Sequence, residues 1–243
     1  MKRLPWIIGL LMVNLASSPL VWPQPEESGG ATNGVRVEVL RILKKLETVG
    51  PFHCMEVRMA TSSQPGEAPK SATATSKVWQ KGPYWRQEGV EPGASLAINK
   101  PEGFFIYQEE AKTFVQPPDF AKEEMLRTFK LPPNQSTGVE RIWSDVLDSA
   151  DLKILGEEVV DGKGATLISY STSPFGIGRE EIKLWLWNDT GLILRREKTV
   201  YINEVVVGTE RTEWKEFVFE DMPDSLFDVP QEQIQKLPED WHP

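Results

Sequence analysis

The residues that most often carry catalysis are few in this chain, and they form no recognisable set. His53 is one of two histidines, and the other, His242, lies next to the C-terminal residue. No serine lies in a Gly-x-Ser-x-Gly motif, in which a strained turn exposes a nucleophile. A lone histidine in a strand is in most proteins structural. We therefore expect no catalytic residues and no enzymatic activity.

The other reactive groups have simpler explanations than chemistry. Cys54 lies in an apolar segment, where a buried, inert thiol is expected rather than a nucleophile. The neighbours Glu109-Glu110, Glu123-Glu124 and Glu157-Glu158 have the residue types of an acid–base pair. Among 36 acidic residues such neighbours arise by chance, so solvated surfaces explain them better. With one cysteine and two histidines, we expect no metal site and no cofactor.

The charge balance argues against nucleic acid as a partner. The 243 residues include 27 Lys or Arg and 36 Asp or Glu, which gives a formal net charge of −9. Nucleic-acid binding draws most of its affinity from concentrated positive charge, and this chain has no basic tract. At 40% hydrophobic residues, the composition is that of a globular protein with a sizeable core.

The first residues have the pattern of a secretory signal peptide. Lys2 and Arg3 precede the apolar residues 4–13, and small residues follow. We expect residues 1–18 to be a signal peptide, with an uncleaved N-terminal anchor as the alternative, because residues 4–22 approach the length of a membrane span. Either way, the body of the chain lies outside the cytoplasm.

The chain after this segment is divided into a linker, one domain and a tail. Residues 19–34 are rich in Pro, Ser, Gly and Glu and predict a flexible linker. Residues 35–237 show no internal boundary and are expected to form a single domain. Residues 238–243 are expected to be a flexible tail.

The periodicity of apolar residues predicts one leading helix followed by many strands. Val39, Leu43 and Leu46 recur at helical spacing, which predicts a helix over residues 35–49 that ends at Gly50-Pro51. Strands are predicted over residues 52–59, 76–81, 84–88, 95–98, 104–108, 112–116, 153–160, 165–171, 181–187, 192–201 and 209–220. Two further helices, over residues 119–129 and 138–147, separate the sixth of these strands from the seventh.

This order of elements predicts a mainly β (α+β) fold. We expect a single curved antiparallel sheet, a half-open β-barrel, with the helices covering its concave face. The strand over residues 181–187 is apolar on both faces, since Ile182 and Leu184 share one face and Trp185 and Trp187 the other. A strand of this kind needs cover on both sides. An apolar cavity results wherever sheet and helices do not fill the space between them, and such a cavity would bind a ligand.

Several motifs, taken in order, resemble a known family. The matching segments are Phe52-His53-Cys54 after a helical stretch, residues 78–86 with their aromatic-rich strand and turn, Pro101-Glu102-Gly103 before Phe105-Ile106-Tyr107, Asp161-Gly162 before Ala165-Thr166-Leu167-Ile168, Lys183-Leu184-Trp185-Leu186-Trp187 followed by Asp189-Thr190-Gly191-Leu192, and the ending from Met222-Pro223-Asp224 to Val229-Pro230. Together they resemble the LolA/LolB-like lipoprotein carrier superfamily, which includes the bacterial outer membrane lipoprotein-sorting proteins.

The resemblance implies a periplasmic, monomeric protein with a lipid-accepting cavity. The aromatic residues on the matching strands are the candidates for its lining: Trp79, Trp85, Phe105, Tyr107, Phe114 and Trp185. One position departs from the family, because Gly82 stands where the carriers have an arginine that helps to hold the lid of the cavity. A glycine has no side chain to make those hydrogen bonds.

We therefore expect a carrier-like periplasmic protein that binds a lipid, or the acyl chains of a lipoprotein, non-covalently in a hydrophobic cavity. Its partners would be that lipid or lipoprotein and a protein of the inner or outer membrane. The alternative is an envelope-stress sensor or protein-interaction module on the same fold.

Overall fold

The computed structural model describes residues 31–63, 68–90, 96–109, 111–117, 143–173 and 178–236. The predicted signal peptide, the predicted tail and the helix predicted over residues 119–129 lie outside these ranges, as do residues 19–30 of the predicted linker.

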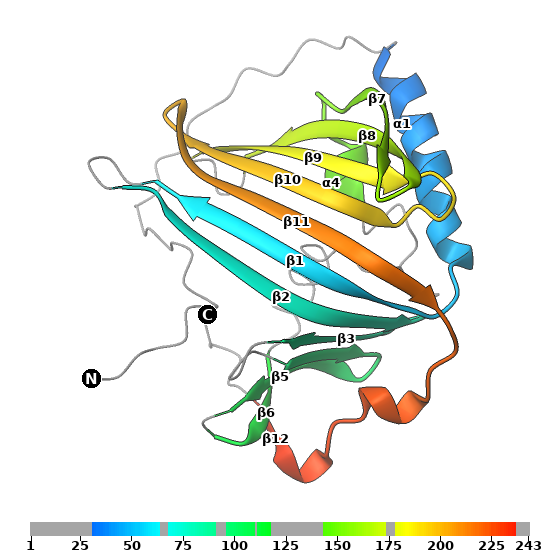
Figure 1. The fold of residues 1–243 in the computed structure, drawn as a ribbon, viewed down its shortest axis with the longest axis vertical. Helices are drawn as coiled ribbons and strands as arrows, with labels where there is room; N and C mark the ends of the chain where they lie inside the picture. The colour runs from blue at the N-terminus through cyan, green and yellow to red at the C-terminus, as the bar shows by residue number, and fades with distance from the viewer. Residues whose placement is uncertain are drawn as a thin grey trace.

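Twelve strands of the described chain form one open, curved sheet (Figure 1). Its order is β12-β6-β5-β4-β3-β2-β1-β11-β10-β9-β8-β7. The strands are β1 (Phe52–Ser62), β2 (Lys70–Lys81), β3 (Tyr84–Gly89), β4 (Leu96–Lys100), β5 (Gly103–Gln108), β6 (Thr113–Gln116), β7 (Lys153–Val160), β8 (Lys163–Thr172), β9 (Arg179–Trp187), β10 (Ile193–Ile202), β11 (Val205–Phe219) and β12 (Ile234–Lys236). Neighbouring strands are antiparallel except β6 and β12, which are parallel. The predicted antiparallel sheet is confirmed, with one short parallel addition at an edge.

The sheet joins two runs of neighbouring strands through its central pair. β1 to β6 follow one another across one half of the sheet, and β7 to β11 across the other. The pair β1–β11 connects the halves, with Phe52 opposite Phe219, 167 positions later in the chain. The middle of the sheet is thus made by its first and its last long strand.

Tight turns set the register of several hairpins. Asp161 (φ 49°) and Gly162 (φ 75°) connect β7 to β8, and Asn203 (φ 50°) and Glu204 (φ 63°) connect β10 to β11. Two consecutive residues with positive φ are typical of the type I′ turn, whose twist matches that of the strands it joins. Three of these four residues are of types that adopt positive φ readily, and Glu204 is not.

The helices cover one face of the sheet, as the sequence predicts. Helix α1 (Ala31–Leu43) and the 3-10 helix η1 (Lys44–Thr48) replace the single helix predicted over residues 35–49. Helix α1 begins four residues early, so the last residues of the predicted linker are helical. The short helix α4 (Ser144–Leu147) lies within the helix predicted over residues 138–147. Helix α1 packs against α4, β7 and β9; in Figure 1 it runs along the right-hand side of the sheet, and α4 lies behind β9 and β10.

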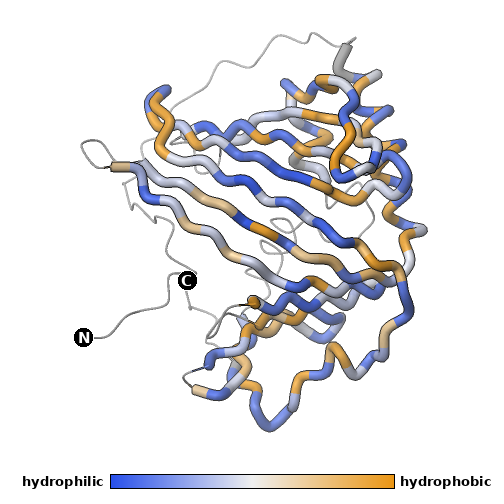
Figure 2. Tube along the Cα trace, viewed as in Figure 1, coloured by the Kyte–Doolittle hydropathy of each residue, from blue (hydrophilic) through white to orange (hydrophobic). Residues whose placement is uncertain are grey.

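Apolar side chains gather in three clusters. The main core joins the two helices to one face of the sheet and contains Val39, Ile42, Leu43, Leu46, Phe52, Cys54, Val78, Trp85, Phe104, Trp143, Val146, Leu147, Leu152, Ile168, Tyr170, Ile182, Leu184, Leu186 and Leu192. We call this face the inner face and the opposite one the outer face. The outer face carries the other two clusters, which are Ile98, Phe105, Phe114, Phe227 and Val229 near one edge and Val160, Ala165, Leu167, Trp185 and Leu194 near the other. Hydrophobic and hydrophilic residues alternate along the central strands, as expected for strands with two different faces (Figure 2).

The C-terminal residues 222–236 form a strap over the outer face. They contain the 3-10 helices η3 (Asp224–Phe227) and η4 (Gln231–Gln233) and end in β12, whose Ile234 lies opposite Phe114 of β6. The strap supplies Phe227 and Val229 to the first outer cluster, which we call the strap cluster. No strand was expected over residues 234–236.

Candidate functional site

The inner face offers an apolar wall that runs across most of the sheet. On the side of α1 it includes Leu184 of β9 and Ile168 of β8, both fully buried. On the far side it includes Trp85 of β3 and Phe104 of β5, with Ile106 only partly buried beside them. This wall lies on the face that the helices cover, which is where the sequence analysis expects a cavity.

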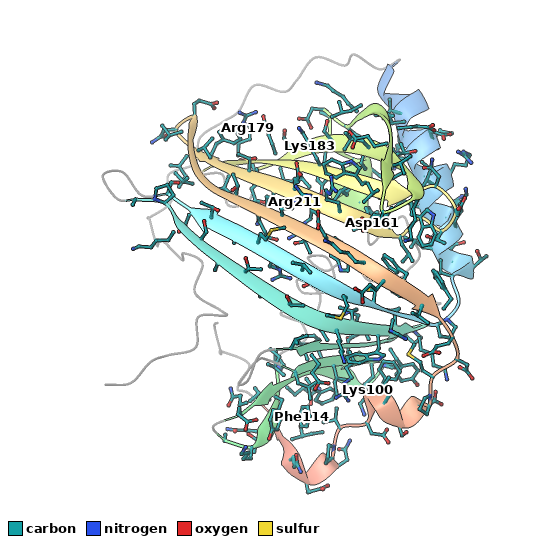
Figure 3. The ribbon with its side chains drawn as sticks, in the orientation of Figure 1. Lys100, Phe114, Asp161, Arg179, Lys183 and Arg211 are labelled. Atoms are coloured by element: carbon teal, nitrogen blue, oxygen red, sulfur yellow. The ribbon has the colours of Figure 1, made fainter. Side chains whose placement is uncertain are left out.

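The six predicted lipid-binding residues do not share this wall. Trp85 alone among them belongs to the main core. Four others lie on the outer face in or against the strap cluster: Trp79, Phe105, Tyr107 and Phe114. Trp185 lies in the cluster at the opposite edge, where its indole N–H donates to Glu158 at 2.8 Å. Figure 3 shows Phe114 on β6, beside the strap.

Strand parity explains this division. Trp79 pairs with Arg86 and Trp85 pairs with Gln80, so the two tryptophans point to opposite sides of the sheet. Parity also predicts that Phe105 and Tyr107 share a face, and both lie at the strap cluster. Alternation in the sequence tells which residues point the same way, but it does not tell which side the helices cover.

Two cations of the outer face hold the strap in place. The Lys81 ammonium donates to the Met222 carbonyl at 2.6 Å and pairs with Asp224 at 2.8 Å. The Arg86 guanidinium donates to the Leu226 carbonyl at 2.8 Å and lies 5.6 Å from the centre of the Trp79 ring. Between these contacts Phe227 is 1% exposed and packs on Tyr84. The strap is therefore a packed part of the fold, held by both polar and apolar contacts.

The middle of the inner face is charged, which the sequence analysis missed. The charged residues lie on β1, β9, β10 and β11 and form what we call the inner charged patch: Glu56, Arg58, Glu180, Arg196, Lys198 and Glu210. Cross-strand pairing puts them on this face, because Arg58 and Arg196 both lie opposite Thr212, and Arg196 also lies opposite Leu184 of the main core. Five of these residues lie in predicted strands, and Glu180 comes directly before the strand predicted over residues 181–187.

The inner charged patch is tightly paired. The Glu56 carboxylate accepts hydrogen bonds from Gln87 at 2.8 Å and Arg58 at 3.2 Å. Lys198 lies 3.5 Å from Glu180 and 3.7 Å from Glu210, which also binds Arg196. Burial raises the pKa of Glu210, but the positive charges of Arg196, Lys198 and Arg58 outweigh it and leave the pKa below its usual value. Glu210 is therefore held as a carboxylate by the cations around it.

The candidates for chemistry lie apart from one another. Cys54 is buried in the main core, and burial raises the pKa of its thiol. His53 points to the outer face and lies 3.1 Å from Glu220. No cluster of three or more His, Cys, Asp or Glu in the described part of the chain could hold a metal ion. None of the helices within the described ranges has both the length and the apolar character needed to cross a membrane.

Gly82 lies in an exposed turn and not in the core. It occupies the turn between β2 and β3 with a φ of 54°, is exposed, and has open space where a Cβ would point. Its carbonyl accepts a hydrogen bond from the side chain of the buried Gln80. The residue serves the turn, because positive φ favours glycine.

Comparisons with known proteins find structures of similar fold but no relative by sequence. No protein-family model matches the sequence, and no curated protein matches it. The chain is similar to the crystal structure of MucB, with a TM-score of 0.50, 16% identity and coverage of 82% of this chain and 64% of that one. It is equally similar to an uncharacterized conserved protein from Thermus thermophilus, with a TM-score of 0.50, 12% identity and coverage of 83% and 98%.

A third match is the Pseudomonas aeruginosa MucA/MucB complex, with a TM-score of 0.49, 16% identity and coverage of 86% of this chain and 66% of that one. The chain spans 64% of the length of the MucB chain that it matches. At these identities the likeness concerns the fold alone. It agrees with the family that the sequence motifs resemble, and the chain therefore has a LolA-like fold.

Proposed function

We propose that this chain is a carrier-like protein that binds a lipid, or the acyl chains of a lipoprotein, against the inner face of its sheet. The inner apolar wall carries this proposal. Helix α1 packs on β7 and β9, whereas the wall continues to Trp85 and Phe104 on the other half of the sheet. There Ala97 and Ile106 remain only partly buried. These partly exposed side chains at the far end of the wall give acyl chains an apolar surface to bury.

The expected binding energy suits a carrier. Each methylene transferred from water to an apolar surface contributes about 0.8 kcal/mol. Twelve methylenes would then give roughly 10 kcal/mol before the costs of ordering the ligand are subtracted. The net affinity is smaller than this gross figure, because the ordering costs are subtracted, and a lipid held in this way can still be released.

Two buried aromatic residues on opposite faces provide a matched test of where the acyl chains bind. Trp85 of the inner wall is 3% exposed, and Phe105 of the strap cluster is 2% exposed. We expect Trp85→Leu to weaken the binding of a fluorescent fatty-acid probe several-fold. Both variants should lower the melting temperature by similar amounts, because both remove buried aromatic side chains. Phe105→Leu should leave probe binding unchanged. Equal binding by both variants would contradict an acyl site at Trp85.

The nature of the natural ligand is tested on the purified protein. Mass spectrometry of co-purifying lipids should find phospholipid or lipoprotein in near-stoichiometric amount. A protein that carries no lipid and binds no fatty-acid probe would instead favour the protein-interaction module.

We also propose a periplasmic location, supported by the signal-peptide pattern of residues 1–18. Fractionation of cells should recover the chain in the periplasmic fraction, shortened at its N-terminus. Full-length chain that only detergent extracts from the inner membrane would establish the N-terminal anchor instead.

A further inference from the structure

The inner charged patch is an unusual surface to find beside a lipid-binding site. Its rows continue directly into the apolar wall: Arg196 lies opposite Leu184, and Lys198 lies opposite Ile182. Ionic groups at positions that hydrophobic residues could fill rarely add stability, because burying charge costs about as much as pairing returns. The Glu56 side chain is only 5% exposed, those of Glu180, Arg196, Lys198 and Glu210 are each about one-fifth exposed, and that of Arg58 is 38% exposed. A role in binding explains why charge is kept there.

The patch carries both signs in equal number. Glu56, Glu180 and Glu210 face Arg58, Arg196 and Lys198, so the formal charge of the six residues is zero. A lone anionic headgroup placed here would meet three carboxylates, and a lone cation would meet two guanidinium groups and an ammonium. A ligand that carries one charge of each sign complements the patch without leaving a net charge in it.

The guanidinium of Arg58 has one buried donor without an acceptor. The Nε of Arg58 is buried and makes no hydrogen bond within the described chain, although the same guanidinium reaches Glu56 through Nη2. An unsatisfied buried N–H is costly, and a phosphate oxygen is a strong acceptor for a guanidinium. The positive charge of Arg58 also acts on Glu210, so a phosphate at Arg58 would lie close to carboxylates that can hold an ammonium group.

We propose that the ligand is a phospholipid with a zwitterionic, ethanolamine-type headgroup. Its phosphate binds Arg58 and Arg196, its ammonium lies against Glu56 and Glu210, and its acyl chains extend over the apolar wall next to the patch. The inference rests on the proposed lipid-binding function and adds the class of lipid. It distinguishes phosphatidylethanolamine from phosphatidylglycerol and from free fatty acids.

The test compares lipids that differ only in their headgroups. The full mature protein is incubated with dioleoyl phosphatidylethanolamine, dioleoyl phosphatidylglycerol or oleate, re-isolated, and its bound lipid is counted by mass spectrometry. We expect retention of the ethanolamine lipid to exceed that of the glycerol lipid by about tenfold, the effect of one charge-assisted contact. Equal retention, or more of the glycerol lipid, overturns the headgroup assignment and leaves the carrier function intact. Retention of no lipid at all overturns the carrier function itself.

Variants then locate the effect. Arg58→Gln and Glu210→Gln should each abolish the preference for ethanolamine while the protein still retains oleate. Arg211→Gln and Glu197→Gln are the matched controls on the outer face, since these residues lie on β11 and β10 as well and point away from the patch. A preference that survives both inner substitutions, or that either control abolishes, places the headgroup elsewhere. If an inner variant fails to fold, the comparison of lipids on the parent chain still decides the assignment.

Discussion

Glu213 is the most strongly held charge on the outer face of the sheet. It is 7% exposed and receives Lys215 at 2.6 Å, Arg195 at 3.3 Å and the Arg211 guanidinium. Burial raises its pKa, but hydrogen bonds from Lys215 and Arg211, together with their positive charges, outweigh burial and lower the pKa to about 2. Figure 3 shows Arg211 on β11, in the middle of this face. The carboxylate offsets three cations that would otherwise repel one another.

This geometry predicts a pH dependence of stability. A folded pKa below the unfolded value means that the stabilisation is complete above about pH 4.5 and is lost as the pH falls toward 2. We expect Glu213→Gln to lower the free energy of unfolding by about 2 kcal/mol at pH 7 and to flatten its fall between pH 4.5 and 2. Glu197→Gln is the control, because Glu197 is more exposed and lies 3.8 Å from Arg211. Urea denaturation as a function of pH measures both, and identical profiles would show that the Glu213 contacts contribute nothing.

Among the elements, the turn between β10 and β11 has one residue of the wrong type. Glu204 adopts a φ of 63°, which strains a side chain with a Cβ, and its one described contact is with Arg179 at 3.3 Å on an exposed surface. Exposed pairs contribute little. Glu204→Gly should therefore raise the free energy of unfolding by up to about 1 kcal/mol. Glu204→Ala removes the same pair and keeps the strain, so thermal melting should rank the glycine variant above it. Equal melting temperatures would contradict strain at this turn.

The positions of the strands were predictable from the sequence, but the face of the sheet to which each side chain points was not. All eleven predicted strands exist, because alternation of apolar residues and Gly, Pro or Asn turns are local signals. Strand β12 was missed because its three residues pair in parallel with a distant strand and carry no pattern of their own. Trp85 and Phe105 look alike in sequence and lie on opposite faces, since only tertiary packing decides which side of a strand the helices cover.

At the scale of the whole molecule, the two faces of the sheet divide the work. The inner face holds the proposed lipid site, and the outer face holds the strap, so stability and binding should respond to different substitutions. Phe227→Ala should cost about 3–5 kcal/mol and lower the melting temperature clearly, because Phe227 is the buried centre of the strap cluster. Binding of the fatty-acid probe should be unchanged.

The control for this substitution is Leu226→Ala, at a neighbouring position that is only partly buried. A folded Phe227→Ala variant that loses the probe would overturn the division of faces. It would place the lipid under the strap, among Trp79, Phe105, Tyr107 and Phe114, where sequence reasoning first put it.

The central pairing of β1 with β11 has a consequence for how the chain folds. Contacts between residues so far apart in sequence give the fold a high contact order. A high contact order slows folding, because the chain loses the entropy of closing a long loop before the contacts between the two strands can stabilise it. The two meanders can form hairpins early, yet the sheet that unites them must wait for the last long strand to be synthesised. A protein built in this way stays incomplete until nearly all of its sequence is available, which is compatible with the proposed export of the unfolded chain across a membrane.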